Sequence, residues 1–554
     1  MPLPIFWVVL LAFCPLLCVN GALRDGRSHG NIIPRPSIPV VTIQDPDEPV
    51  LSRNGTVLPP YNTTYIFNQL IDHNNPSLGM FQQRYWHTYE FYEPGGPIIL
   101  MTPGEANAAP YTGYLTNRTI NGLIAQQENG AVIVLEHRFY GLSNPYPDLT
   151  VNSLRLHTLQ QAIDDLVYFA KNVELPMPNG GEVGPDKAPW ILTGGSYSGA
   201  LTSWTIVNQP GVFWAGYSSS GVVEAILDYW RYFEPIRQNM AANCSADVGA
   251  VIAHIDQSAI QTIKSSFGMG DMTHLDDVAG ALRNNLWDWQ SLQPTSGPGA
   301  QFFEFCDALE VKNGVSASAK GWGLDHALTA WSSYFKNTYI SELCGNVDAE
   351  TCLGTYDPTQ DYYTDTSIDN SGRSWNWIVC NQVGYLQDGP PQGLPAIVTR
   401  LVQPSYDFRQ CSYMFPAAFP TPPTTINVAK TNEAYEGWDV RTNRLFFANG
   451  IRDPWREATV SAQTVNVPST ASQPIGLGDG FHCSDLLTAN GAIDPTIAAV
   501  QSQALETMHT WLREWTPGRR RNSDHGSSSK FSSRSLTGPK EKPVNAWFRG
   551  SGTI

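Results

Sequence analysis

The stretch from Ile191 to Trp204, ILTGGSYSGALTSW, constrains the fold more than any other part of this chain. A short apolar run stops at two glycines, presents Ser196 and continues into residues that favour a helix. A strand, a tight turn of small residues and an immediate helix are the parts of a nucleophile elbow, which lifts a serine hydroxyl above a sheet. A glycine-rich turn without a nucleophile has the same local pattern, so this stretch alone leaves both interpretations open.

The elbow departs from the strict G-x-S-x-G pattern at one position. Ser198 stands where the second glycine belongs, and Gly199 follows it. Serine is small enough for this position, and Gly199 can share the role of the missing glycine. If Ser198 were the nucleophile, Ser196 and Ala200 would occupy the flanking positions, which fits the pattern less well. We therefore expect Ser196 to be the nucleophile.

The surrounding sequence predicts an α/β fold with a parallel sheet. From about residue 95 to 220, short apolar runs alternate with helical periods, as in GGPIILMTPGE, GAVIVLEHRFYG and APWILTGGS. The strand-like pattern returns at RLFFANG, which ends at Gly450. A helix that crosses over the sheet is predicted where five apolar residues share one face: Leu156, Leu159, Ile163, Leu166 and Ala170.

Residues 226–425 differ in character and predict an inserted helical domain. Helical periods are separated there by loops rich in Gly, Pro and Asp, and six cysteines lie between positions 244 and 411. Those six allow about 15 pairings, which the sequence leaves open. Cys483 is the seventh cysteine outside the leader, and we expect it to be the unpaired thiol. The α/β domain is accordingly split into two parts, residues 23–225 and 426–516.

Both ends of the chain differ from the parts between them. Residues 1–22 contain an apolar run that ends in small residues, which predicts a cleaved secretory signal, with a signal anchor as the alternative. Residues 517–554 are rich in Ser, Gly, Lys and Arg and have no periodicity, so we expect a disordered basic tail. This tail could instead touch an acidic wall or a membrane surface. It lacks the apolar end that a lipid anchor needs, and we expect no stable membrane anchor.

Composition limits the partners and the compartment. The formal net charge of −16 argues against nucleic acid, because the chain would repel a phosphate backbone. We expect a secreted, extracellular protein, with a vacuolar or lysosome-like compartment as the alternative, and a monomer or homodimer. Four sequons fit glycosylation on that route: Asn54, Asn62, Asn117 and Asn243.

Two further residues complete a candidate catalytic triad. A serine hydroxyl needs a histidine to take its proton, and that histidine needs a carboxylate to hold its tautomer. Asp453 follows the apolar run LFFANG, and His482 lies in the glycine-flanked segment DGFHCSDL before the last predicted helix. The order Ser, Asp, His along the chain is the order of α/β hydrolases. We therefore expect Ser196, Asp453 and His482 to form the triad.

Other polar motifs are weaker or absent. His137, His157 and His509 precede the serine or fall on predicted helices, which is typical of structural histidines. Neither H-E-x-x-H nor C-x-x-C occurs, so we expect no metal and no cofactor. The oxyanion hole should use the backbone N–H of Tyr197 and a second amide from the loop MTPGEANAA, with Gly104 as the candidate.

Eight ordered blocks resemble one peptidase family: PIILMTPGEAN, EHRFYGLSNP, LQQAIDDLVYF, GGSYSG, SSSGVVEAILDYWRYFE, WNWIVCNQVGYLQ, NGIRDPW and GFHCSDL. The chain resembles the serine peptidases that include lysosomal Pro-X carboxypeptidase, dipeptidyl peptidase II and secreted fungal relatives. Carried over by position, the family's nucleophile, aspartate and histidine fall on Ser196, Asp453 and His482. The resemblance implies an α/β-hydrolase domain with a disulfide-containing helical cap, peptide or protein substrates, and cleavage next to proline, usually at acidic pH.

The chain departs from the family pattern at three places. It has Gly-Phe-His-Cys where the family often has Gly-Ala-His-His, and Ser198-Gly199 where the family doubles the glycine. Gln382 stands where a glutamate is common, which puts binding of a substrate's amino group in doubt. Glu105 keeps one carboxylate nearby, either to bind substrate or to stabilise its own loop.

Aromatic residues near these motifs are candidates for a proline-sized pocket, because flat rings pack well on a pyrrolidine. We expect Trp455, beside Asp453, to line it ahead of Trp375, Trp377 and Tyr385. A lipase or carboxylesterase would use the same triad on esters, and a binding protein without activity could keep the same fold. The sequence leaves open whether the enzyme is a carboxypeptidase, a dipeptidyl peptidase or an endopeptidase.

Overall fold

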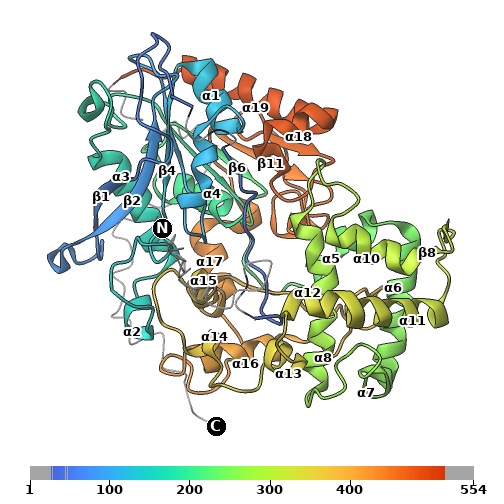
Figure 1. Ribbon diagram of the computed structural model, residues 1–554. Helices are drawn as coiled ribbons and strands as arrows, with labels where there is room; N and C mark the ends of the chain where they lie inside the picture. The colour runs from blue at the N-terminus through green and yellow to red at the C-terminus, as the bar shows by residue number, and fades with distance from the viewer. Residues whose placement is uncertain (1–26, 28, 44, 46–47, 518–554) are drawn as a thin grey trace, which may run out of the picture.

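The protein is described by a computed structural model that covers residues 27, 29–43, 45 and 48–517 (Figure 1). The predicted leader, residues 1–22, lies outside the described residues, as does the predicted basic tail except for Pro517. Neither prediction is therefore tested by the structure.

A mixed eight-stranded sheet forms the centre of the molecule. The strands run in the spatial order β1-β2-β4-β3-β5-β6-β11-β12. The first two are antiparallel to their neighbours, and all other neighbours in the sheet are parallel. The bounds are β1 (Tyr65–Leu70), β2 (Met80–Thr88), β3 (Ile98–Met101), β4 (Ala131–Leu135), β5 (Trp190–Gly195), β6 (Ala215–Ser219), β11 (Leu445–Gly450) and β12 (Ile475–Gly478).

Helices cover both faces of the sheet, which explains why the central strands read as continuous apolar runs. Every residue of β3, β4, β5, β6 and β11 is buried. Alternate residues of β3 enter different cores: Ile98 and Leu100 pack with α3, while Ile99 and Met101 pack on the side of α1 and α19. The helices of these two layers are α1 (Ile120–Glu128), α3 (Leu159–Asn172), α4 (Tyr197–Asn208), α17 (Val428–Tyr435), α18 (Thr488–Ile493) and α19 (Pro495–Arg513).

The predicted crossover helix and the predicted α/β-hydrolase fold are confirmed. Helix α3 begins at Leu159, so Leu156 lies in the turn before it, and all five residues of the predicted face are buried. The chain passes from β5 through a sharp turn into α4, as the elbow requires.

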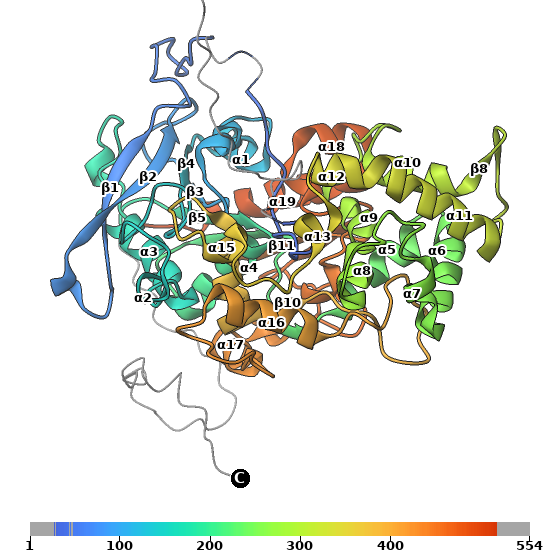
Figure 2. The same ribbon diagram turned by 60° about the horizontal axis from the view of Figure 1, so that its bottom comes forward.

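Between β6 and β11 the chain leaves the sheet and forms the helical cap, which lies to one side of the carboxyl ends of the strands (Figures 1 and 2). Two short strands, β7 (Ile226–Asp228) and β10 (Gly384–Leu386), pair near its base, and β8 (Val311–Lys312) pairs with β9 (Val315–Ser316) at its far end. Its longest helices are α6 (Ala242–His254), α10 (Gln301–Glu310), α11 (Leu324–Tyr334) and α16 (Pro404–Met414). The shorter helices are α5 (Phe233–Asn239), α7 (Ile260–Ile263), α8 (Leu275–Ala281), α9 (Asn284–Trp287), α12 (Ile340–Cys344), α13 (Ala349–Leu353), α14 (Asp361–Thr364) and α15 (Ser371–Ile378).

Three disulfides staple the cap, and all six cysteines that the sequence placed in one region take part. The pairs are Cys244–Cys306, Cys344–Cys352 and Cys380–Cys411. The first joins α6 to α10, and the second joins α12 to α13. Among the described cysteines only Cys483 is unpaired, and it is buried, which confirms the prediction that it is the free thiol.

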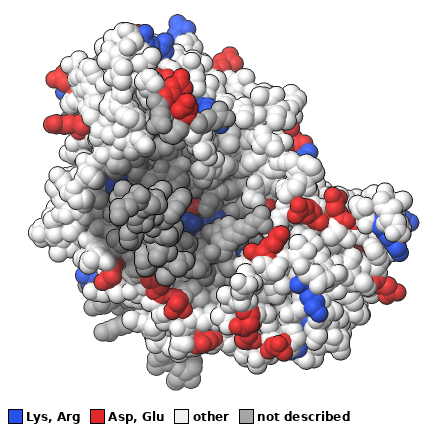
Figure 3. Space-filling model, viewed as in Figure 1, with Lys and Arg blue, Asp and Glu red and all other residues white. Residues whose placement is uncertain are grey.

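Acidic side chains are scattered over the face shown in Figure 3, with fewer basic ones among them, and this face is hollowed near its centre. The spread of charge agrees with the net charge of −16. None of the described helices is long and apolar enough to cross a bilayer.

Candidate active site

Ser196 occupies a strained turn between β5 and α4. Its φ of 60° and ψ of −123° lie outside the regions that a residue with a side chain normally adopts. The turn is tight because its glycines allow close contact: a Cβ on Gly194 would lie 2.1 Å from Ser198 O, and one on Gly199 would lie 2.7 Å from Ser219 O. Glycine is therefore required at both positions.

The second serine of the elbow has a structural role. The Ser198 hydroxyl donates to Gly195 O at 2.9 Å and accepts from Gly195 N at 3.0 Å. A strict elbow has glycine here, but in this chain the hydroxyl bridges back to the strand end. The departure at Ser198 is thus accommodated, and Ser196 remains the serine that projects from the turn.

Asp453 and His482 meet at the same edge of the sheet. Asp453 follows β11, and His482 lies in the loop after β12. His482 Nδ1 is 2.8 Å from Asp453 Oδ1, which also accepts from Trp455 N at 2.8 Å. If Nδ1 carries the proton and donates to the carboxylate, Nε2 is left as the proton acceptor.

The backbone brings the histidine loop against the elbow. Cys483 N donates to Ser220 Oγ at 3.0 Å, while Ser196 N donates to the neighbouring Ser219 O at 2.8 Å. The Cys483 sulfur would lie 3.0 Å from a Cβ on Gly195. Ser196 Oγ and His482 Nε2 are both buried and have no hydrogen-bond partner among the described residues. The candidate nucleophile and its candidate base therefore lie on loops that contact each other, and each has a polar atom that no described residue hydrogen-bonds.

The electrostatics favour a charged histidine. Burial lowers the pKa of His482, but the charge and the hydrogen bond of Asp453, together with the influence of the neighbouring Cys483, outweigh burial and hold this pKa well above its usual value. Burial raises the pKa of the Cys483 thiol, which keeps it protonated. The direction found for His482 is opposite to the one that activity at acidic pH would require.

The two candidate oxyanion donors differ in whether their backbone N–H groups are already used in hydrogen bonds. Tyr197 is the first residue of α4, so its N–H has no acceptor four residues earlier within the helix. Gly104, at φ 80°, lies against the same helix start: its Cβ would be 3.2 Å from Ser198 Cβ. Gly104 N already donates to Thr102 Oγ1 at 3.2 Å, however. Its role as the second donor therefore stays a prediction.

Glu105 lies beside these groups and is only 1% exposed. Neither of its carboxyl oxygens has a hydrogen-bond partner among the described residues. Burial raises its pKa to about 8, against smaller opposing effects from its own backbone N–H and from the charges of Arg35 and His482. The Tyr140 hydroxyl, which the sequence did not single out, is also buried without a partner in the described part of the chain.

An aromatic cluster flanks the histidine. The Trp455 ring lies 6.3 Å from the His482 ring and contacts Tyr385, Tyr229 and Tyr232 at centroid distances of 5.3, 5.5 and 5.4 Å. Sequence reasoning missed the two tyrosines at 229 and 232, although both lie in the block SSSGVVEAILDYWRYFE. The Trp375 ring contacts the ring of Tyr197, the residue after Ser196, at 5.3 Å.

Gln382 is not brought to the candidate triad. Its side-chain oxygen accepts from Leu159 N at 3.0 Å, so it caps the start of α3. Its position in a family motif suggested substrate binding, but a motif does not tell which way a side chain points. Trp377 likewise bonds away from the triad, from its indole N–H to His157 O.

The cap supplies two glutamines that sequence reasoning missed. Gln293 Nε2 donates to His482 O at 3.0 Å, and Gln290 Oε1 accepts from Trp455 Nε1 at 2.7 Å. These hydrogen bonds from the cap therefore stabilise the loop that carries His482 and the segment that follows Asp453. No local signal marked these residues, because their role depends on how the cap folds back onto the α/β domain.

The other histidines have structural roles. His137 Nε2 lies 3.1 Å from Tyr197 Oη, and burial lowers the pKa of His137 to about 4. His157 packs against it, and burial lowers the pKa of His157 as well. His509 is paired with Glu128 on the surface. The described residues hold no group of three or more His, Cys, Asp or Glu side chains placed to bind a metal ion.

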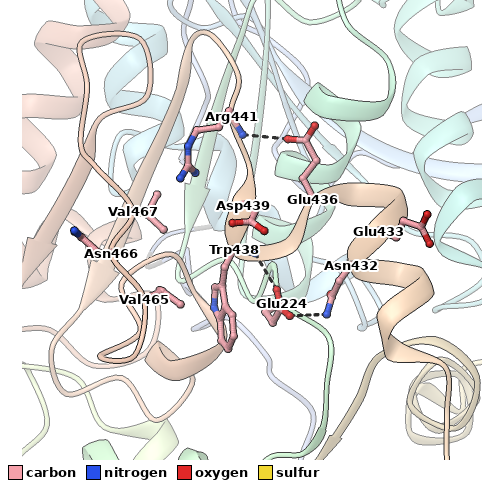
Figure 4. Close-up of a pocket in the computed structure, with 10 residues that line it drawn as sticks. All are labelled: Glu224, Asn432, Glu433, Glu436, Trp438, Asp439, Arg441, Val465, Asn466 and Val467. Carbon is pink, nitrogen blue, oxygen red and sulfur yellow. Dashed lines mark hydrogen bonds between the residues drawn. The ribbon is translucent and has the colours of Figure 1, made fainter. Parts of the chain in front are cut away.

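A cavity of about 470 Å³ lies apart from the triad and is rich in carboxyl groups (Figure 4). Several of these groups are already bonded within the chain: Glu224 accepts from Asn432 Nδ2 at 2.6 Å and from Trp438 N at 2.9 Å. Glu436 accepts from Arg441 N. These hydrogen bonds hold the wall of the cavity together.

Comparison with known proteins identifies a peptidase family. The family model described as "Serine carboxypeptidase S28" matches residues 69–273 and 304–503. "Serine protease vicPa" of Bipolaris victoriae is 34% identical over 475 residues, which cover 81% of this chain and 88% of the relative. A "Probable extracellular serine carboxypeptidase" of Arthroderma benhamiae is 31% identical and covers 78% of this chain and 64% of the relative. The human "Thymus-specific serine protease" is 26% identical, with 80% and 86% covered.

Proposed function

The chain belongs to the serine carboxypeptidase S28 family and is a serine peptidase, and from this premise we propose that Ser196, Asp453 and His482 are its catalytic triad and that it cleaves next to proline. The observation that carries the proposal is the 2.8 Å contact between His482 Nδ1 and Asp453 Oδ1, which leaves Nε2 without a partner among the described residues, on a loop that contacts the loop next to the strained Ser196 turn.

In the proposed mechanism, His482 Nε2 takes the proton of Ser196 Oγ as the oxygen attacks the scissile carbonyl. Asp453 holds the imidazole and stabilises its charge. The negative carbonyl oxygen is stabilised by the N–H of Tyr197, with Gly104 as the candidate second donor. His482 then donates its proton to the leaving amine. In the second half of the reaction, His482 takes a proton from water as the water oxygen attacks the acyl-enzyme, and it returns this proton to Ser196 Oγ as the acid product leaves.

Proline specificity is supported by the aromatic cluster beside His482. The Trp455 ring is fully buried near the candidate base, and Tyr229, Tyr232 and Tyr385 surround it. A pyrrolidine ring packs well against such surfaces. Trp375 lies beside Tyr197 and could form the opposite wall of the same subsite.

Glu105 is the best candidate to bind a charged end of the substrate. A carboxyl that only stabilised its own loop would have hydrogen-bond partners, and its two oxygens have none among the described residues. An arriving ammonium group would favour the ionised carboxylate and lower its pKa from about 8. Binding of a free amino terminus would make the enzyme an aminodipeptidase rather than a carboxypeptidase.

We further propose that the protein is secreted. One relative carries the name of an extracellular enzyme. The apolar leader at residues 1–22 fits a signal peptide, and the asparagines of three sequons, Asn54, Asn62 and Asn117, are exposed to solvent.

The test is cleavage of one proline-containing peptide in three forms, free at both ends, N-acetylated and C-amidated, followed by mass spectrometry. The form that resists cleavage separates the three modes, since an aminodipeptidase needs the free amino end and a carboxypeptidase the free carboxyl end. A peptide with alanine in place of proline is the matched control. Equal cleavage of both peptides would contradict proline specificity, and faster hydrolysis of a simple ester than of any peptide would favour an esterase.

A further inference from the structure

Residues 29–41, which we call the strap, run between the two halves of the molecule. The dark-blue ribbon of this region passes between the sheet and the cap helices in Figures 1 and 2. The strap contains Pro34, Pro36 and Pro39 within the sequence NIIPRPSIPV and has no helix or strand. Proline fixes φ and removes a donor, so this segment favours an extended shape, as a bound peptide would.

One end of the strap is fastened to the cap. Gly30 N donates to Cys352 O at 3.1 Å. Asn31 Nδ2 donates to Leu353 O at 2.6 Å and to Asp277 O at 2.9 Å. The His29 ring stacks on Tyr362 at 4.2 Å, and burial lowers its pKa to about 3.

The other end is fastened to the α/β domain. Tyr114 Oη donates to Pro39 O at 2.7 Å. Ile38 and Val41 are buried in the core cluster that also contains Ile191 and Cys483. Ile38 reaches the elbow itself, because a Cβ on Gly195 would lie 2.7 Å from Ile38 Cγ2.

The middle of the strap crosses the candidate active site. The Arg35 guanidinium donates to the carbonyl oxygen of Glu105, and Gln290 Nε2 from the cap donates to Arg35 O at 2.9 Å. The charge of Arg35 also acts on Glu105, Tyr111 and Tyr140. A cavity of about 400 Å³ remains between strap residues, the cap and His482.

With the strap in this position, the reacting groups are closed to solvent. Ser196 is 0% exposed, and His482 and Glu105 are each 1% exposed. A substrate carbonyl must come within about 3 Å of Ser196 Oγ to react. A peptide that reached Ser196 along the cleft would need the space that Arg35 and its neighbours fill.

We propose that the strap is an autoinhibitory occupant of the substrate cleft, and that the enzyme becomes fully active only when residues 34–38 leave it. The inference rests on the proposed function, because it takes the cleft beside Ser196 to be the peptide site. The Arg35 guanidinium lies close enough for its charge to act on the Glu105 carboxyl, although its hydrogen bond goes to the Glu105 carbonyl oxygen. An occupant of this kind reduces the fraction of competent enzyme, so it raises KM and leaves kcat unchanged.

The test uses the full chain with the strap still attached, as verified by the intact mass of each sample. Two variants loosen the strap at different places: Arg35→Ala removes the bond to Glu105, and Asn31→Ala removes two bonds to the cap, away from the reacting groups. Arg53→Ala is the matched control, since Arg53 also donates to backbone carbonyls, those of Phe91 and Gln126, outside the cleft. The readouts are the rate at which a fluorophosphonate labels Ser196, the KM and kcat for a proline peptide, and the melting temperature.

In both loosening variants, the fluorophosphonate should label Ser196 roughly tenfold faster or more, and KM should be lower by a similar factor at unchanged kcat. A factor of this size is expected because each variant loses a strong hydrogen bond that holds the strap in the closed state. Arg53→Ala should behave as the wild type. Added synthetic peptide of residues 29–41 should compete with substrate in the Asn31→Ala variant.

Equal labelling rates in the wild type and both variants, with the strap shown to be present, would overturn the proposal and leave the proposed function standing. A lower melting temperature without faster labelling would also overturn it, because a purely structural strap predicts that result. If every form is labelled at Ser196 but none cleaves peptides, the peptidase proposal fails. The labelling rates then still test whether the strap blocks access to Ser196. Absence of labelling in every form would overturn both.

Discussion

His482 Nδ1 lies 2.8 Å from Asp453 Oδ1, although the two residues come from loops after different strands of the sheet. The same carboxylate oxygen accepts the N–H of Trp455, so the carboxylate is held from two sides. This contact occupies Nδ1 of His482 and leaves Nε2 without a hydrogen-bond partner among the described residues. It is the geometric basis of the proposed catalysis.

Replacing Asp453 by Asn should lower kcat by roughly 10³ to 10⁴-fold with little change in fold, because an amide can hold the imidazole in the wrong tautomer. Steady-state kinetics on a proline peptide measures this loss. Asp479→Asn is the matched control: Asp479 is paired with Arg452 in a half-exposed position and should be dispensable for activity. A loss of less than tenfold in Asp453→Asn would contradict the assigned role.

The pH dependence of kcat/KM should report the histidine. His482 must be neutral to act as a base, and the charge of Asp453 holds the pKa of His482 well above its usual value of 6.5 in the closed state. Activity should therefore fall as the pH drops through that raised pKa. In Asp453→Asn, the residual kcat/KM should fall only at a lower pH than in the wild type, because the carboxylate charge that stabilises protonated His482 is gone.

An acid limb of kcat/KM well below pH 6.5 in the wild type would contradict this arrangement of charges. Such a limb would agree instead with the acidic activity implied by the family resemblance. It would mean that the charge around His482 changes when the cleft opens.

Glu105→Gln should raise KM for a peptide with a free amino end by roughly tenfold and leave the N-acetylated peptide unaffected, because only the free amine can pair with a carboxylate. Glu136→Gln is not a suitable control, since Glu136 is bonded to Arg84 in the core. The matched control is Glu93→Gln, because Glu93 lies exposed on the surface. Equal effects on both peptides would contradict a role in binding the amino end.

The same variant has a readout in stability. The folded-state pKa of Glu105 is raised from 4.5 to about 8, so between these values the folded state binds more protons than the unfolded one. The free energy of unfolding should therefore fall as the pH rises from 4.5 to 8, by about 1.4 kcal/mol for each pH unit at most. The total loss over this range is up to a few kcal/mol. Thermal unfolding of Glu105→Gln should show a smaller decline over this range than the wild type.

Glycosylation should be uneven among the four sequons. Asn54, Asn62 and Asn117 are exposed. Asn243 is half-buried at the start of α6, where its amide faces Ser316 Oγ and Ala317 O at 3.4 Å, and its neighbour Cys244 is tied to Cys306. Mass spectrometry of the secreted protein before and after deglycosylation should find glycans at three sites, and occupancy at Asn243 equal to the others would contradict the prediction.

The sequence predicted the central fold because its signals are local. The apolar runs at β3, β4, β5 and β11 and the elbow at Ser196 each depend on a few consecutive residues. The order Ser, Asp, His then placed Asp453 and His482 at the same edge of the sheet as the elbow. Cys483 was expected to be the free thiol because the count is odd and the other six cysteines lie together between positions 244 and 411.

The parts that could not be predicted depend on how distant segments fold together. Gln382 was expected near the substrate but caps α3, because a motif position does not set a side chain's direction. Gln290 and Gln293 reach the strap and the histidine loop only because the cap packs against the α/β domain. Nothing in the local pattern around Arg35 indicates that it lies beside Glu105.

The most direct test of the central claim is to identify the residue that a fluorophosphonate modifies, by peptide mapping of the labelled wild type and of Ser196→Ala. Labelling should occur on Ser196 and should disappear in Ser196→Ala together with peptide cleavage. Modification of Ser198 or another serine, or peptide cleavage by Ser196→Ala at the wild-type rate, would contradict the account.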